Sequence, residues 1–231
     1  MKKAFTLTFI CFSFFARTQT IKLENSSFEK VDSIVNRLMF SDPISGKMRD
    51  TFLFLGVKNI HDWADCGAKG ETPPDILPNS DYGINWAAQD GAYYIGMVTR
   101  DNSTWEAIGQ KIQPQLLADS CYEMTAWLMS SWKYNSFSRK TGKPVNYDKP
   151  ARLRIWGGSK ICDSKELLFT SDPIQNRAWM PYSFVFKAHT NIIFIKFESY
   201  YTEGSEVYNG NLLIDNFSDI KPCDCVKLHN K

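Results

Sequence analysis

Residues 182–201 read YSFVFKAHTNIIFIKFESYY, two runs of alternating side chains around a short polar break. The apolar residues that share one face of each run are, in chain order, Tyr182, Phe184, Phe186, Ile193, Ile195 and Phe197. A β-strand places successive side chains on opposite faces, so a period of two marks a strand with one buried face. The stretch therefore predicts two consecutive half-buried strands.

The same signal recurs on both sides of this stretch. Leu153 and Ile155 alternate with Arg152, Arg154 and Trp156. Further candidate strands, in chain order, are residues 51–57, 92–100, 105–113, 121–130 and 212–220. Gly, Pro, Asn and Asp clusters separate these runs and predict turns. Many short strands with regular turns predict an all-β fold, an antiparallel β-sandwich.

Two segments depart from the strand pattern. Between Ser27 and Met39, apolar residues recur at helical spacing, which predicts one helix, although the opening residues equally suit the end of a strand. Residues 65–89 are rich in Pro, Gly, Asp and Asn and predict an ordered surface loop outside the core.

The N-terminus has the organisation of a secretory signal. Lys2 and Lys3 precede an apolar run from Ala4 to Ala16, which is too short to anchor in a bilayer. We therefore expect residues 1–20 to be a signal peptide, 21–226 a single sandwich domain and 227–231 a short tail. The protein is expected to be secreted or periplasmic and not membrane-spanning. With 27 basic against 25 acidic residues and no charge blocks, nucleic acid is not an expected partner.

Five cysteines remain after the signal, and an oxidising compartment favours disulfides. Cys223 and Cys225 are two apart, so an extended chain points them to opposite faces and disfavours a bond between them. We expect Cys66 to pair with Cys162, and Cys121 with Cys223 or Cys225. The three histidines stand apart without the spacing of a zinc site.

Enzyme motifs are absent from the sequence: it has no Gly-x-Ser-x-Gly elbow, no His-Glu-x-x-His and no phosphate-binding glycine loop. We therefore expect no catalysis. Glycan hydrolysis is the alternative, because it needs only two carboxylates at a suitable distance. The acids considered for it are Asp90, Glu106, Glu198 and Asp215.

Several short motifs occur in a characteristic order. They are NSSFE at 25–29, GAYYIG at 91–96, WEAIGQ at 105–110, RIWGG at 154–158 and LIDN at 213–216. Over residues 22–225 this set resembles the galactose-binding-domain-like jelly rolls found among carbohydrate-binding modules. More narrowly, it is similar to exported domains of gliding Gram-negative bacteria.

The resemblance implies a non-catalytic binding module for carbohydrate or cell-wall glycan. It also implies a structural calcium ion held by Glu29 and Asp215, with Asp90 as a neighbour, since calcium prefers oxygen ligands. In the alternative, Glu29 and Asp215 hydrogen-bond loop backbone. A second alternative function is a cell-envelope component for protein interaction, adhesion or gliding.

Sugar binding needs aromatic rings beside planar polar groups. Most of the seven tryptophans are expected in the core. The rings expected outside it are Trp86, Trp105, Trp132 with Tyr134, and Tyr200 or Tyr201. The predicted ligand-binding residues are Trp86, Arg100, Trp105, Glu106, Gln110, Arg154 and Tyr200, on a face or loop edge.

Overall fold

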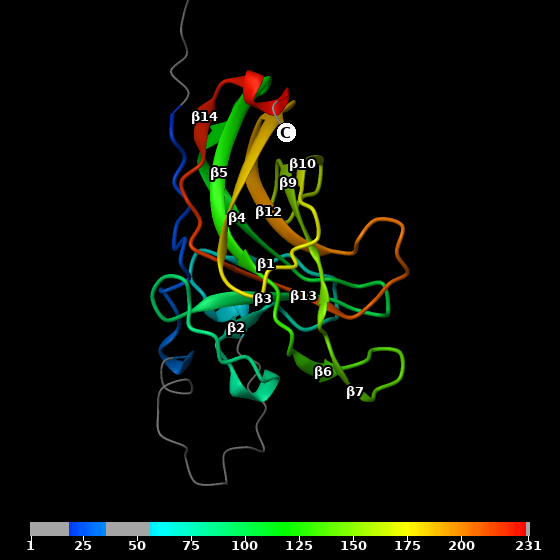
Figure 1. Cartoon of the computed structure of the whole chain (residues 1–231). Helices are drawn as coiled ribbons and strands as arrows, with labels where there is room; N and C mark the ends of the chain where they lie inside the picture. The colour runs from blue at the N-terminus through cyan, green and yellow to red at the C-terminus, as the bar shows by residue number, and fades with distance from the viewer. Residues whose placement is uncertain (1–18, 36–55, 230–231) are drawn as a thin grey trace, which may run out of the picture.

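The computed structural model describes residues 19–35 and 56–229 of the chain (Figure 1). The predicted signal peptide, except its last two residues, lies outside this part, as does most of the strand predicted at 51–57. In the described residues no helix is long and apolar enough to cross a membrane.

Two β-sheets form the body. The first has the order β1 (Ala64–Asp65), β4 (Ala107–Leu116), β12 (Ile192–Tyr200), β9 (Arg152–Gly158) and β10 (Glu166–Thr170). All neighbours in this sheet are antiparallel. The strands predicted from alternation at 152–156 and 192–201 therefore lie side by side at its centre.

The second sheet has the order β11 (Met180–Ala188), β5 (Ser120–Met129), β13 (Gly210–Asp215), β3 (Tyr94–Thr99) and β2 (Asp75–Leu77). β14 (Lys221–Cys223) pairs with β5, and β8 (Lys149–Pro150) pairs with β13. The remaining elements are the hairpin of β6 (Asn135–Phe137) and β7 (Pro144–Asn146), and the 3₁₀ turns η1 (Val57–Asn59), η2 (Ser80–Tyr82) and η3 (Cys225–His229). The predicted antiparallel β-sandwich is confirmed.

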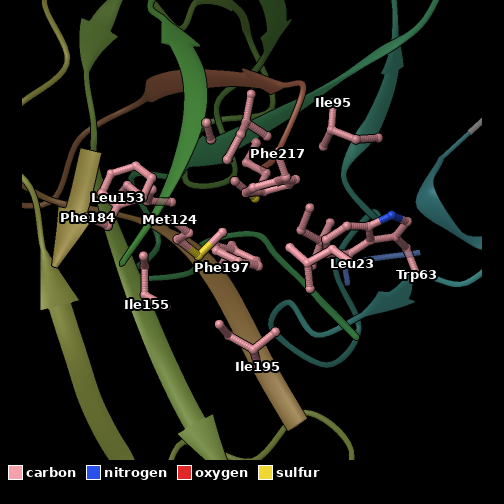
Figure 2. Packing of buried hydrophobic residues seen from close by; sticks show 14 of the residues in the cluster. Leu23, Trp63, Ile95, Met124, Leu153, Ile155, Phe184, Ile195, Phe197 and Phe217 are labelled. Atoms are coloured by element: carbon pink, nitrogen blue, oxygen red, sulfur yellow. The ribbon is translucent and has the colours of Figure 1, made fainter. Parts of the chain in front are cut away.

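The main core fills the space between the sheets. Phe197 of β12 lies 4.5 Å from Phe217, measured between ring centroids, and Trp63 stacks on Phe217 at 5.4 Å. Phe184 of β11 reaches the same core from the other sheet (Figure 2). The inward face predicted for both runs is therefore buried at Phe184, Phe186, Ile195 and Phe197. Ile193 is only half-buried, and Ile192 takes the inward position, because the pairing of β12 with β4 is irregular between Ile192 and Phe194.

A smaller apolar cluster covers the other side of the second sheet. It joins Tyr94 and Leu213 to Tyr134 and Tyr147 from around the β6–β7 hairpin. Two segments differ in part from their predictions. Residues 65–89 contain β2, whose Ile76 and Leu77 are fully buried, because a three-residue strand is too short to show alternation. The predicted helix at 27–39 is helical only at 33–35 among its described residues, and residues 36–39 lie outside the described part.

Two disulfides close the fold. Cys66 bonds to Cys162, as predicted, and the second bridge joins Cys121 to Cys225. Of the two partners considered for Cys121, Cys223 is therefore the wrong one. Cys223 lies opposite Cys121 in the β14–β5 ladder, but the bond is made by the residue two positions further on.

We expect Phe197→Ala to lower the free energy of unfolding by about 3 to 5 kcal/mol, because it empties the centre of the aromatic core. Phe137→Ala is the matched control, since that ring is 56% exposed and its loss should change stability by less than about 0.5 kcal/mol. Urea unfolding of the oxidised protein, followed by circular dichroism, measures both. Equal losses in the two variants would contradict the assigned core.

Candidate functional site

The outer face of the first sheet, which points away from the core, carries charged and aromatic side chains. Register places Trp156 beside Lys196, Arg154 beside Glu198, and Arg152 beside Tyr200. Lys111 of β4 lies beside Phe194 on the same side. We call this set, together with Trp105 two residues before β4, the outer face. Its composition follows from strand alternation: the neighbours Leu153, Ile155, Ile195 and Phe197 all point into the core.

Glu198 organises the centre of the outer face. Its Oε1 accepts hydrogen bonds from Arg154 Nε at 2.7 Å and Trp156 Nε1 at 3.2 Å, and a second Arg154 nitrogen also donates to it. Its Oε2 accepts one from Lys196 Nζ at 2.9 Å. Only 3% of the Glu198 side chain is exposed. A buried carboxylate needs such partners, and together they hold the guanidinium and the indole rigidly.

Aromatic rings surround the Arg154 guanidinium. Its central carbon lies 3.2 Å from the Tyr200 ring centroid, and the Trp156 and Trp105 rings lie within 6 Å. Trp105 meets Tyr200 edge to face at 4.9 Å. All three rings are half-buried. A cation above ring faces is favourable, so the rings and the guanidinium fix one another.

A loop covers one end of the outer face. Residues 159–165 connect β9 to β10, and Cys162 in this loop is bonded to Cys66, next to β1 at the opposite edge of the sheet. Lys196 Nζ donates a hydrogen bond to Ser164 Oγ in the same loop. The disulfide therefore straps the loop across the sheet on the Lys196 side, whereas Trp105 and Tyr200 lie at the other end.

Three of the predicted ligand-binding residues come together here: Trp105, Arg154 and Tyr200. Trp86 does not join them. It is 38% exposed, but its carbonyl accepts a hydrogen bond from Tyr94 Oη, whose ring lies on the outside of the second sheet. Trp132 is 67% exposed, as predicted, but it precedes β6 and is also outside the outer face.

Gln110 has a structural position. Its side-chain amide exchanges two hydrogen bonds of 2.8 Å with the backbone of Glu24 and donates a third to the carbonyl of Asp62. These bonds fix the N-terminal segment against β4. The amide is buried, and both its nitrogen and its oxygen are used in these hydrogen bonds. The structure therefore corrects the prediction that Gln110 binds ligand.

The structure also corrects the prediction that Arg100 and Glu106 bind ligand. They form a buried ion pair with side chains 2% and 1% exposed, and Arg100 also donates to Thr72 Oγ1 at 2.8 Å. Glu106 in addition accepts the backbone N–H of Val98. The motif beginning at Trp105 thus turns Glu106 inward, where neither member of the pair reaches the surface.

Asp75 lies beside this pair and is half-buried. Tyr134 Oη donates a hydrogen bond to its carboxylate, so Tyr134, only 1% exposed, is not the surface ring that was predicted. Burial raises the pKa of Asp75 to about 6, against the opposing effects of the hydrogen bonds from Tyr134 and Tyr82 and of the Arg100 charge. Burial also raises the pKa of Glu106 well above its ordinary value.

Trp156, Lys196, Arg152 and Lys111 belong to the outer face but were not among the predicted ligand residues. The signal for Trp156 and Arg152 was present, because the alternation of residues 152–156 puts both on the face of Arg154. The signal for the two lysines was weaker. The two lysines can be placed beside Arg154 only if β4 and β9 are known to flank β12. The sheet order shows this, and the sequence of a single strand does not.

The carboxylates predicted to hold calcium accept hydrogen bonds from loop backbone. Asp215 accepts the N–H groups of Gln89, Asp90 and Asn216, and Glu29 accepts those of Ala92 and Tyr93. The described residues contain no group of three or more His, Cys, Asp or Glu side chains that could hold a metal ion. The hydrogen bonds are those of the backbone-clamp alternative.

Calcium binding stays a prediction that calorimetry can measure. Calcium is titrated into the chelator-treated protein and into Glu29→Gln. Binding heat together with a raised melting temperature, both lost in the variant, would support the ion. If no heat and no shift appear, the clamp is the role of these carboxylates.

The acids considered for hydrolysis are not gathered on the outer face. Glu198 is the only carboxylate among the outward residues of β4, β9 and β12. Asp90 and Asp215 lie at the loop clamp, and Glu106 is buried with Arg100. The described outer face therefore lacks the carboxylate pair that two-acid hydrolysis needs.

No protein-family model and no curated protein matches the chain. Among solved structures, a Stig cyclase from Fischerella sp. TAU is 12% identical, with a TM-score of 0.47 over 89% of this chain and 98% of that one. The K3 adhesin domain of Lys-gingipain from Porphyromonas gingivalis is 13% identical, with a TM-score of 0.42 over 70% of this chain and 91% of that one. The CBM22-1 xylan-binding domain of Paenibacillus barcinonensis Xyn10C is 12% identical, with a TM-score of 0.40 over 73% of this chain and 89% of that one. At these values no ligand or activity is carried over to this chain.

We expect Asp75→Asn to change how stability depends on pH. Because the folded pKa of about 6 exceeds the ordinary 3.8, ionisation of Asp75 destabilises the fold as pH rises from about 4 to above 6. The amide cannot ionise, so the free energy of unfolding of the variant should rise relative to wild type by on the order of 3 kcal/mol between pH 4 and pH 7. Urea unfolding at each pH measures it.

Asp148→Asn, an exposed substitution of the same type, corrects for the change in net charge. A difference between Asp75→Asn and wild type that is constant from pH 4 to pH 7, or that moves in the opposite direction, would contradict the raised pKa of Asp75.

Proposed function

We propose that this protein is an exported, non-catalytic module that binds glycan, carbohydrate or peptidoglycan, on the outer face of its first sheet. The observation that carries the proposal is the Arg154 guanidinium, fixed by Glu198 and stacked on Tyr200 next to Trp105. Rings beside planar polar groups are what sugar recognition needs, since rings cover the apolar face of a pyranose and polar groups meet its hydroxyls.

Rigidity supports a binding role for this cluster. A ligand that meets a preformed site does not bear the entropic cost of ordering its side chains. Glu198 holds Arg154, Trp156 and Lys196 at once, and the strapped loop adds a contact to Lys196. These groups contribute nothing to the core, which lies on the other side of the sheet, and a buried ion pair is a weak source of stability.

Export is part of the proposal. The basic and apolar N-terminal segment has the form of a secretory signal. The two disulfides, which span 96 and 104 residues of chain, fit an extracellular or periplasmic compartment, because such bonds are rare in the reducing cytosol.

A second candidate function, an envelope protein-interaction or adhesion module, draws on a different surface. Trp132 and Phe137, which lie before and within β6, are 67% and 56% exposed. Large exposed rings are characteristic of protein interfaces. This surface does not belong to the outer face, so variants can separate the two functions.

We expect Trp105→Ala and Tyr200→Ala each to weaken glycan retention by roughly tenfold or more, because each removes a ring from the proposed site. Trp132→Ala is the matched control: it also removes an exposed tryptophan, but outside the outer face. Affinity electrophoresis on a panel of soluble polysaccharides, and pull-down on purified peptidoglycan, measure retention. Circular dichroism confirms that each variant is folded.

Retention lost in Trp132→Ala but unchanged in Trp105→Ala would overturn the assignment to the outer face. Absence of retention on every polymer, together with co-purification of an envelope protein that depends on Trp132, would favour the interaction module. Release of reducing sugar by the wild type would overturn the non-catalytic role.

A further inference from the structure

Positive charge is concentrated on the outer face. The outward residues of β4, β12 and β9 include four cations and one carboxylate: Lys111, Lys196, Arg152 and Arg154 against Glu198. The four cations less the one acid give this face a charge of +3, whereas the whole chain carries +2. The face is therefore more basic than the rest of the molecule taken together.

Glu198 cannot neutralise all of this charge. Its two oxygens are already shared by Arg154 and Lys196, so one negative charge is set against two positive ones. The excess positive charge of Arg154 and Lys196 is therefore held in a fixed position beside the aromatic rings.

Arg152 and Lys111 are still less compensated. Among the described residues, Arg152 meets only Glu203 within ion-pair range, at 3.7 Å, and that side chain is 89% exposed, so solvent and salt screen the pair. The Arg152 Nε is buried and has no hydrogen-bond partner in residues 19–35 and 56–229. Lys111 is exposed and forms no ion pair within the described part of the chain. Such cations beside a proposed sugar site are available to an anionic group.

Position links this charge to the rings. Arg152 lies directly opposite Tyr200 in the β9–β12 ladder, and Arg154, two residues along the same face, stacks on that ring. A sugar ring placed against Trp105 and Tyr200 would thus have guanidinium groups at its border. Guanidinium forks match carboxylate and sulfate groups in geometry as well as in charge.

We infer that the glycan bound on the outer face is acidic, carrying carboxylate or sulfate groups that Arg152 and its neighbouring cations recognise. This inference rests on the proposed function and specifies its ligand class. Neutral sugars would satisfy the rings and leave the surplus charge unused.

The test compares acidic polymers with their neutral counterparts on the folded wild-type protein. The probes are polygalacturonate and its carboxyl-reduced form, and κ-carrageenan and its desulfated form. Affinity electrophoresis should show retention by an acidic polymer at least tenfold stronger than by its neutral counterpart, and weaker at higher salt. The two pairs distinguish a carboxylate from a sulfate ligand.

The double variant Arg152→Gln, Lys111→Gln removes two of the four cations without touching the Glu198 network. It should lower retention of the acidic polymer roughly tenfold. The control is Lys140→Gln, Lys143→Gln, which removes the same charge from exposed positions between β6 and β7 and should leave retention unchanged.

The outcomes separate this inference from the proposed function. Equal retention of acidic and neutral polymers, lost in Trp105→Ala, would overturn the acidic ligand and keep glycan binding. An equal loss in the two double variants would show only non-specific charge attraction and would also overturn the inference. Failure of all four polymers and of the wider polysaccharide panel to be retained would overturn both.

Discussion

The opposite orientation of successive side chains in a β-strand is the constraint on which both the core and the site depend. In β12, Ile195 and Phe197 point into the sandwich, while Lys196 and Glu198 point out of it. A slip of one residue in the register would bury the charges and expose the rings. The apolar core therefore fixes the position of the charged cluster, and the outer face inherits its rigidity from the packing behind it.

Loop connections are held by polar groups that act over long separations in the sequence. Glu29 and Asp215 accept backbone N–H groups from residues 89–93. Gln110 makes two hydrogen bonds to Glu24 in the N-terminal segment and a third to Asp62. The Cys66–Cys162 bridge adds a covalent strap across the first sheet. These contacts all join residues more than 45 positions apart, so they stabilise the folded arrangement and not any local element.

The strands of the sandwich could be predicted because each shows its own alternation, as residues 152–156 and 192–200 do. The buried strand β2 could not, since three residues in a Pro- and Asp-rich stretch carry no period. The site was predictable in part. Trp105 and Tyr200 follow from their ring type and their turn or strand-end positions, and Arg154 follows from the alternation of residues 152–156. The burial of Glu106 depends on its ion pair with Arg100, which follows β3.

Burial also decides what the two main charge clusters can do. Around Glu106 and Asp75, removal from water raises the pKa of both carboxyls, and Arg100 serves the fold by offsetting part of that cost. On the outer face, Glu198 is just as buried, but it is set against more positive charge than it can neutralise.

Charged groups at a binding site contribute more to the choice of partner than to affinity, because their attraction is offset by desolvation. Rings supply contact area without discriminating strongly among sugars. A face that combines the two, with the cations fixed by the sheet and the rings at its uncovered end, is therefore suited to select a glycan by its charge while the rings bind its surface.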